Sequence, residues 1–174
     1  MYIKFFSLLC TVLLLGGCQS AKQIENSFDE QYLANSTDLI FSSPNLSALH
    51  LPPLMSGFAY VEAFTAEGFC EGESKHISKV TVTRDNRTQY SKIASGNIVL
   101  NVGLYAKGAT GGGLTGNSFY SLEVDPAMTY KITITEARPF VTSYTVDVEA
   151  VSEEGIASLP AQFVGGYNNI CNEN

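Results

Sequence analysis

The sequence has no tryptophan, only two histidines and four cysteines among its 174 residues. Few histidines argue against nucleophilic catalysis, because a serine or cysteine nucleophile needs a histidine or an equivalent base beside it. Ten Lys and Arg stand against 17 Asp and Glu, which gives a net charge of −7. Nucleic-acid binding requires basic patches, so no nucleic-acid partner is expected. The length suits one ordinary domain.

The beginning of the chain has the three parts of an export signal. Lys4 supplies the positive charge, Phe5–Leu15 is apolar, and Gly16-Gly17 supplies small residues before Cys18. The apolar run is about 11 residues long, and a membrane-spanning helix needs ~20, so no transmembrane anchor is expected. The alternative is an ordinary secretory signal that is cut nearby and leaves Cys18 as a plain thiol.

The run Leu13-Leu14-Leu15-Gly16-Gly17-Cys18 resembles the lipobox of bacterial lipoprotein signal peptides. The resemblance implies cleavage before Cys18, a diacylglycerol thioether on its sulfur and an acylated amino terminus, with acyl chains such as palmitate. Two or more acyl chains anchor a protein stably to a membrane. Gln19 stands where an Asp is associated with inner-membrane retention in enteric-type bacteria. The resemblance therefore favours the outer membrane, with the domain facing either the periplasm or the outside.

The expected leader also assigns a role to each of the four cysteines. Cys10 leaves with the signal and Cys18 takes lipid, which leaves Cys70 and Cys171 in an exported chain, where disulfides persist. A bond between them would close a loop of about 100 residues, worth on the order of 4–5 kcal/mol in the chain-entropy model. Two free thiols and a metal site are the alternatives, and neither histidine fits a metal-ligand spacing.

The expected organisation is a signal over 1–17, a lipidated N-terminus and tether over 18–55, and a folded domain over 56–174. Within the tether, Ile24, Phe28 and Tyr32 recur every four residues and predict a short amphipathic helix over 21–33. The segments 35–38 and 42–45 have the composition of turns. Two interpretations stay open: a spacer that holds the domain off the membrane, or a helix that caps the domain.

From Gly57 onward, apolar residues recur with a period of two, which is typical of strands. The expected strands are Phe58–Phe64, Ile77–Thr83, Thr88–Ile93, Ile98–Leu104, Phe119–Val124, Tyr130–Thr135 and Phe140–Val151. About six to eight short strands without helical periodicity predict an all-β domain, an antiparallel β-sandwich of the immunoglobulin or transthyretin type. A barrel is the alternative.

Gly96, the alternating Ile98–Val102 and the later Tyr130-Lys131-Ile132 resemble small surface β-sandwiches of the PEGA or carboxypeptidase-regulatory type. The resemblance covers about residues 57–136. It implies a fold and carries no site residues.

A glycine-rich stretch over Gly111–Gly116 matches the letters G-x-G-x-x-G. Dinucleotide binding requires a helix after the glycines, whose N-terminus receives the pyrophosphate. Here Asn117–Leu122 follows, which reads as a strand, and no Lys-Ser/Thr pair completes a phosphate-binding loop. We therefore expect a loop between strands, and no cofactor.

Three glutamates, Glu67, Glu71 and Glu73, flank Cys70. Carboxylate oxygens are calcium ligands, so these residues are weak candidates for a calcium site, and solvated surface charge is the alternative. A glycosidase pair would require a cleft around two of them. For serine hydrolysis the chain lacks the G-x-S-x-G elbow, and its two histidines are His50, in the tether, and His76, before a strand.

The last expected strand places Thr145, Asp147 and Glu149 on one face, as a solvated sheet surface would. If this strand lies at a sheet edge, it can accept a partner by strand addition, and its acids discourage indiscriminate pairing.

These observations predict a non-catalytic lipoprotein on the outer membrane, held there by lipid on Cys18, whose β-sandwich binds a protein or an envelope component. The alternatives are an accessory subunit of a secretion or surface-appendage machine, and an envelope enzyme or enzyme inhibitor with a dispersed site. An enzyme needs a concave pocket with convergent polar groups. A binding module needs an exposed apolar patch or an open sheet edge.

Overall fold

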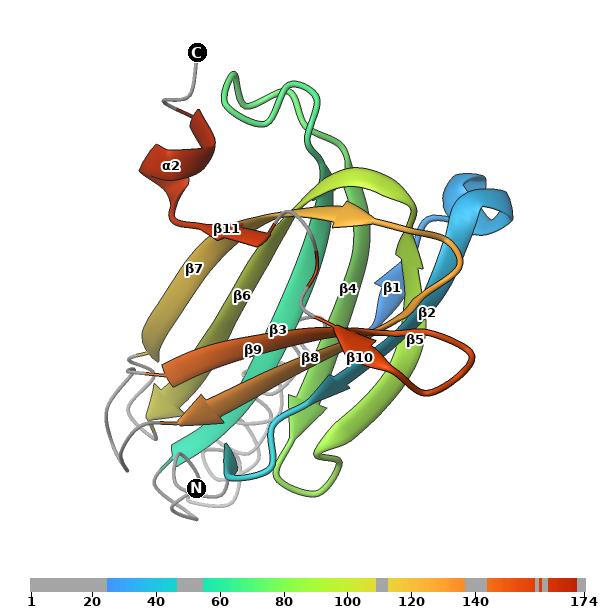
Figure 1. The fold of residues 1–174 in the computed structure, drawn as a ribbon. Helices are drawn as coiled ribbons and strands as arrows, with labels where there is room; N and C mark the ends of the chain where they lie inside the picture. Colours follow the sequence, from blue (N-terminus) through green and yellow to red (C-terminus); the bar gives the residue numbers. More distant parts are fainter. Residues whose placement is uncertain are drawn as a thin grey trace, which may run out of the picture.

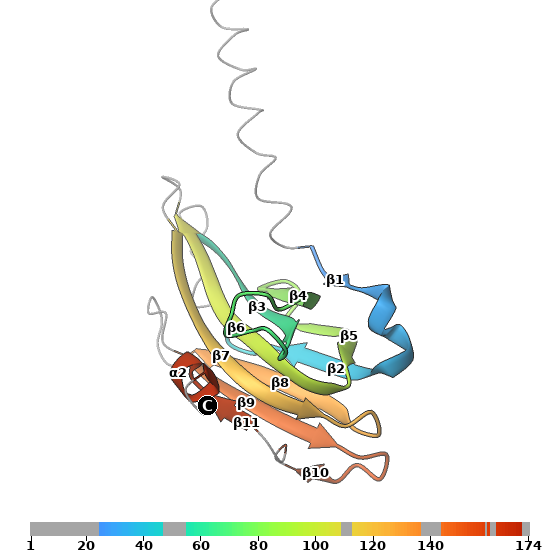
Figure 2. The same ribbon diagram turned by 90° about the horizontal axis from the view of Figure 1, so that it is seen from above.

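Two β-sheets pack face to face in the computed structural model, which describes residues 25–46, 55–108, 113–136, 144–158, 160 and 163–171 (Figure 1). One sheet has six strands in the order β1-β4-β3-β6-β7-β11, and the other has five in the order β10-β9-β8-β2-β5. Seen from above, β8 and β9 form a layer beside β6 and β7 (Figure 2). The prediction of an all-β sandwich is confirmed.

The described strands outnumber the six to eight expected, because three of them have only two or three residues. They are β1 (Ser27–Phe28), β2 (Ser36–Ser42), β3 (Met55–Thr65), β4 (His76–Thr83), β5 (Thr88–Ala94), β6 (Gly96–Gly108), β7 (Gly113–Val124), β8 (Thr129–Glu136), β9 (Tyr144–Val151), β10 (Ala157–Ser158) and β11 (Phe163–Gly165). Two short helical elements accompany them, the 3-10 helix η2 (Glu30–Asn35) and α2 (Tyr167–Cys171).

The core lies between the sheets, because successive side chains of a strand point to opposite faces and one face of each sheet is apolar. The five-stranded sheet contributes Leu39, Phe41, Ile132, Ile134 and Val148, and the six-stranded sheet contributes Val80, Val82, Leu100, Val102 and Leu122. All ten of these side chains are buried. The alternation that predicted the strands therefore also predicted which side chains fill the core.

The prediction of a tether over 18–55 is wrong where the chain forms β2, because that strand is part of the sandwich. Strand β2 lies inside the five-stranded sheet, antiparallel to β5 and parallel to β8. Its side chains alternate, with Thr37, Leu39 and Phe41 buried between the sheets. Residues 35–38 were read as a turn because Asn, Ser and Asp favour turns, yet burial of the alternate residues outweighs that preference. Residues 44–45 do form the expected turn.

The amphipathic helix predicted over 21–33 is also wrong in its described part. Strand β1 occupies two of those residues and pairs with β4. The helix that does form, η2, begins later, where the Asp29 carboxylate accepts a hydrogen bond from the Gln31 amide nitrogen at 3.1 Å. A short polar segment cannot sustain a helix without a capping group and a surface to pack on, and Asp29 provides the cap.

The glycine-rich stretch is partly a strand rather than a loop, since β7 begins at Gly113 and Gly116 pairs with Leu104 of β6. Dinucleotide binding would require a helix after the glycines. The expected strand follows them instead, and this excludes the dinucleotide interpretation. In β6, Gly103 has a steric role. A Cβ at Gly103 would meet the carbonyl oxygen of Gly116 and would lie 2.8 Å from the Tyr60 hydroxyl.

Short connections carry the chain between the sheets: residues 125–128 join β7 to β8, and two more at β5 form one side of the sandwich. Residues 84–87 join β4 to β5, which belong to different sheets and contact each other. Ser95 alone separates β5 from β6, and Gly96 there has a φ of 97°, which glycine adopts readily. We call this the closed side. The other side is bounded by β7 of one sheet and β9 of the other, and we call it the open side.

Candidate binding site

The open side carries a long stretch of strand edge without a described neighbour. In the five-stranded sheet, β9 is covered by β10, which pairs only with Val151 and Ala150. From Tyr144 to Glu149, no described strand pairs with the outer edge of β9. Edge strands present unpaired backbone N–H and C=O groups, which can bond an added strand.

The inward-facing side chains of β9 are more deeply buried near β10 than farther from it. Ala150 and Val148 are 3% and 2% exposed, whereas Val146 and Tyr144 are half-buried. All four side chains point into the same space between the sheets, because they alternate along one strand. The interior is therefore sealed beside β10 and partly open beyond it.

Tyr144 joins the two sheets across this open side. Its hydroxyl donates to the carbonyl oxygen of Val102 at 2.8 Å and lies 3.2 Å from Ser118 Oγ. Burial raises the pKa of Tyr144 to about 12 from the ordinary 10, and the neighbouring hydroxyl of Ser118 opposes this rise. Burial likewise raises the pKa of Tyr120, a second inward-facing tyrosine on β7. Both phenols are therefore neutral hydrogen-bonding groups at physiological pH.

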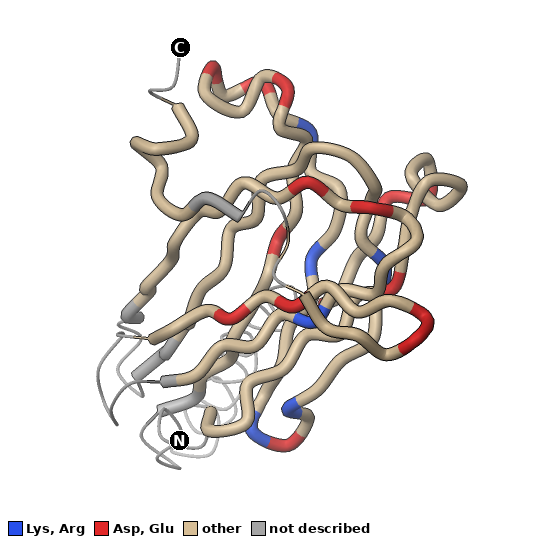
Figure 3. Tube along the Cα trace, viewed as in Figure 1, with Lys and Arg blue, Asp and Glu red and all other residues tan. Residues whose placement is uncertain are grey.

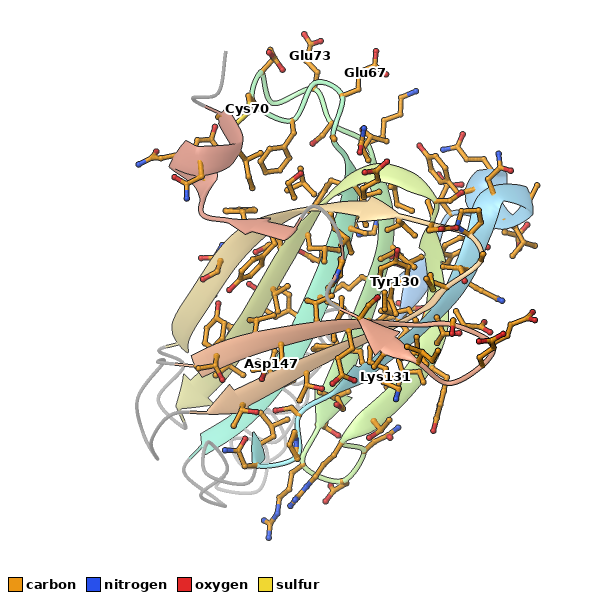
Figure 4. All side chains as sticks on the ribbon, viewed as in Figure 1. Glu67, Cys70, Glu73, Tyr130, Lys131 and Asp147 are labelled. Carbon is orange, nitrogen blue, oxygen red and sulfur yellow. A yellow bond between two sulfur atoms is a disulfide. The ribbon has the colours of Figure 1, made fainter. Side chains whose placement is uncertain are left out.

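The outer face of β9 is acidic and solvated, as predicted. Thr145, Asp147 and Glu149 are all exposed, and acidic segments lie along β9 in Figure 3. On the neighbouring β8, Lys131 pairs with Glu149 in register and Thr133 pairs with Asp147 (Figure 4). One cation and two carboxylates thus share the surface of this strand pair.

A second surface lies on the outer face of the six-stranded sheet. A shallow pocket there is lined by Phe58, Tyr60, Glu62, Lys79, Tyr105 and Thr115. Its charges neutralise each other, since Lys79 Nζ lies 2.9 Å from Glu62 Oε1. Phe58 and Tyr60 are 7% and 8% exposed, so their rings offer little surface to a ligand.

A pocket of about 500 Å³ lies under the turn between β7 and β8. Val124, Met128, Tyr130 and Ala150 contribute to its apolar part, and Glu123 and Asp125 to its polar part. The Tyr130 hydroxyl accepts from the Asp125 amide at 2.8 Å and lies 3.3 Å from the Glu123 carbonyl oxygen. Through these two contacts the Tyr130 hydroxyl holds the turn in place. Burial raises the pKa of Tyr130.

A disulfide joins Cys70 and Cys171, as the sequence predicted, with their Cα atoms 5.5 Å apart. It fastens α2 to the loop between β3 and β4. Beneath it, the Phe69 ring packs against the rings of Phe119 and Tyr167 at centroid distances of 5.5 and 6.0 Å. Because β11 precedes α2 and pairs with β7, the bond also secures the cover over part of the β7 edge.

The three glutamates of this loop do not lie together as one group of possible metal ligands. Glu67, Glu71 and Glu73 are exposed, and Figure 4 shows Glu67 and Glu73 extending from the loop into solvent. Among the residues with described positions, no three His, Cys, Asp or Glu side chains lie together as a metal site would need.

The remaining predicted residues divide between the described and the other parts of the chain. Cys18 and His50 lie outside the described residues. His76 packs edge-on against the Phe64 ring, with centroids 5.4 Å apart. Within the described ranges, no helix has the length and apolar character to span a bilayer.

Two features of the open side were not predicted from the sequence. Nothing in the alternating pattern of the strand expected over 140–151 indicated that the Tyr144 hydroxyl bonds to β6, which lies far away in the chain. The two residues of β10 are too few to produce a periodic signal. The sequence predicted strand addition at β9 only if this strand lies at a sheet edge, and it did not show that it does.

In comparisons with protein-family models, curated protein sequences and solved structures, nothing matches the chain. Its function is therefore argued from the site geometry and from the N-terminal motif.

Proposed function

We propose that the chain is a bacterial outer-membrane lipoprotein whose non-catalytic β-sandwich binds a protein of the cell envelope. The lipobox-like run before Cys18 supports lipid anchoring. The charge supports it indirectly, because the chain after the leader carries nine Lys and Arg against 17 acids, or −8. Such a domain is repelled by anionic lipid surfaces and needs a lipid to stay at a membrane.

The observation that supports binding of a protein is the outer edge of β9, which no described strand covers from Tyr144 to Glu149. Proteins usually block such an edge, because it can pair with any extended chain. In this chain, six consecutive residues of β9 pair with β8 on one edge and have no described partner strand on the other. A binding module needs an accessible backbone edge of this kind, and strand addition is a common mode of peptide recognition.

The anchoring is tested by replacing the lipid-accepting residue. We expect Cys18→Ser to move the protein from the membrane fraction to the soluble fraction, and the loss of the fatty acid to appear in the mass of the mature protein. Cys10→Ser is the matched control, since that residue leaves with the signal, and it should change neither result. Continued membrane association of the Cys18→Ser protein would contradict the proposal.

Binding is tested in intact envelopes with photo-crosslinking residues placed singly at exposed positions. Thr145 reports the open side, Tyr90 the far edge of the same sheet, and Glu73 the disulfide-bonded loop. We expect a discrete adduct with one envelope protein from at least one position, and its absence from the Cys18→Ser protein. No adduct from any position would contradict a binding role.

A further inference from the structure

We infer that the β9 edge from Tyr144 to Glu149 binds an extended peptide segment in which basic and apolar side chains alternate. This inference rests on the proposed binding function and names its site and the chemistry of its partner. The peptide would add as a strand next to β9, on the side where β10 covers only Ala150 and Val151.

The inner face of the site requires apolar side chains. Val146 and Tyr144 are half-buried, while Val148 and Ala150 on the same strand are fully buried next to β10. An added strand would place every second side chain between the sheets beside Val146 and Tyr144. Apolar side chains there would remove the remaining apolar surface from water, as β10 already does farther along.

The outer face of the site requires cations. Asp147 and Glu149 point outward from β9, and a strand added there would place its own outward side chains directly beside them. Only one of the two carboxylates has a cation opposite it in register, Lys131 beside Glu149. Opposite charges in directly facing positions stabilise strand pairs and like charges destabilise them. Lys or Arg at alternate positions of the peptide meets this requirement.

The same charges argue against a second copy of the chain as the occupant. Pairing two β9 edges in antiparallel register would bring the carboxylates of both copies together, and each chain is already strongly acidic. The far edge of the sheet, β5, is a poorer candidate. Its inward residues are Gln89, Ser91 and Ile93, in register with Phe41, Leu39 and Thr37. Ile93 is 0% exposed and the half-buried Gln89 and Ser91 are polar, so an added strand would find little apolar surface to cover there.

The probe is a synthetic peptide, acetyl-Lys-Val-Lys-Val-Thr-Val-amide with a fluorophore, titrated against the full lipoprotein in non-ionic detergent. In antiparallel register its two lysines face Glu149 and Asp147, and its threonine faces Thr145. We expect saturable binding that weakens as salt rises, because exposed charges are screened. Hydrogen exchange of the backbone amides of β9 between Tyr144 and Glu149 should slow when the peptide binds.

Two matched double variants distinguish binding at the β9 edge from a general attraction of the basic peptide to an acidic protein. Asp147→Lys with Glu149→Lys should weaken binding by about tenfold or more, since it replaces attraction by repulsion at the site. Glu71→Lys with Glu73→Lys changes the net charge equally at the disulfide-bonded loop and should have little effect. Equal losses in the two variants would overturn the inference.

Backbone pairing is tested with two further peptides, each N-methylated at one of the two alternating sets of residues. In a strand pair only one set of amides faces the partner, so one peptide should lose binding and the other should keep it. Equal binding by both would overturn the inference. If the peptide fails to bind but crosslinking finds an envelope partner elsewhere, only this inference fails. If the peptide binds and no position is crosslinked in envelopes, the proposed function fails.

Discussion

The two sides of the sandwich are closed by different means. On the closed side, the chain itself passes between the sheets, through residues 84–87 and Ser95, and β4 contacts β5. On the open side, β7 and β9 belong to separate parts of the chain. There the turn over residues 125–128 joins β7 to β8, which is not an edge strand, and the Tyr144 hydroxyl of β9 reaches Val102 in the other sheet. The flap of β11 and α2, held by the disulfide, covers part of the β7 edge.

The difference shows where this fold can change without losing its core. A short covalent connection keeps two strands close together even when the contacts around them are lost. A hydrogen bond and a short disulfide-bonded flap can be displaced or removed one at a time. Binding regions tend to lie in the less stable parts of a structure, and the proposed peptide site is on the side with the weaker links.

The largest expected effect comes from the core shared by both sides. Phe41→Ala should lower the free energy of unfolding by about 3–5 kcal/mol, because this ring is 0% exposed and its removal leaves a cavity. Val146→Ala, on the half-buried part of β9, should cost less than ~1 kcal/mol. Chemical denaturation of both variants measures this contrast. Equal losses would show that the open side is packed as tightly as the core.

The next effect concerns the disulfide that holds the flap. Replacing both Cys70 and Cys171 by Ser should lower the free energy of unfolding by about 2–5 kcal/mol, since the bond closes a long loop. Hydrogen exchange should then quicken in β11 and α2 first, and leave β2 and β8 protected. Peptide mapping of the unreduced protein should recover the two cysteines as one linked pair, and free thiols at both would contradict the pairing.

The smallest effect concerns Tyr144 and depends on pH. Tyr144→Phe removes the bond to the Val102 carbonyl and should cost about 1–2 kcal/mol. The pKa of this phenol is raised to about 12 in the folded protein, so its contribution is fully present below pH 10. As pH rises from 10 to 12, the unfolded state ionises first and stability falls. The variant should therefore lose stability less steeply over that range.

Tyr90→Phe is the matched control for this measurement. Tyr90 is 76% exposed on the outer face of β5, so its removal should change neither the stability nor its pH dependence. If both variants behave alike, the Tyr144 hydroxyl does not link the sheets in solution.

Much of the sandwich was predictable because alternation and burial are linked in a strand. The run Ile98, Leu100, Val102 and Leu104 shows the pattern most clearly, and these side chains are all buried. The failure at β2 has a definite cause, since turn-forming residues surround its three buried side chains. Sequence pattern carries no information about which strand pairs with which, so the parallel pairing with β8 could not be foreseen.

For the candidate site, the acidic face of β9 was predictable and its open edge was not. Asp147 and Glu149 reveal their exposure through alternation within one strand. Whether another strand covers that edge depends on β10, whose two residues leave no periodic signal. The disulfide was predictable because the expected leader includes Cys10 and assigns lipid to Cys18, which leaves Cys70 and Cys171 to pair.

The pairing of β2 with β8 has a consequence for how the chain reaches this fold. Ser42 and Thr133, whose side-chain oxygens lie 3.1 Å apart across these strands, are separated by 91 positions in sequence. Contacts between such distant segments slow folding, because a long loop must close before they form. During synthesis, β2 can pair with β5 long before residues 129–136 of β8 have been added. Until then one edge of an interior strand stays bare, so the growing chain needs protection from misassembly until residues 129–136 reach it.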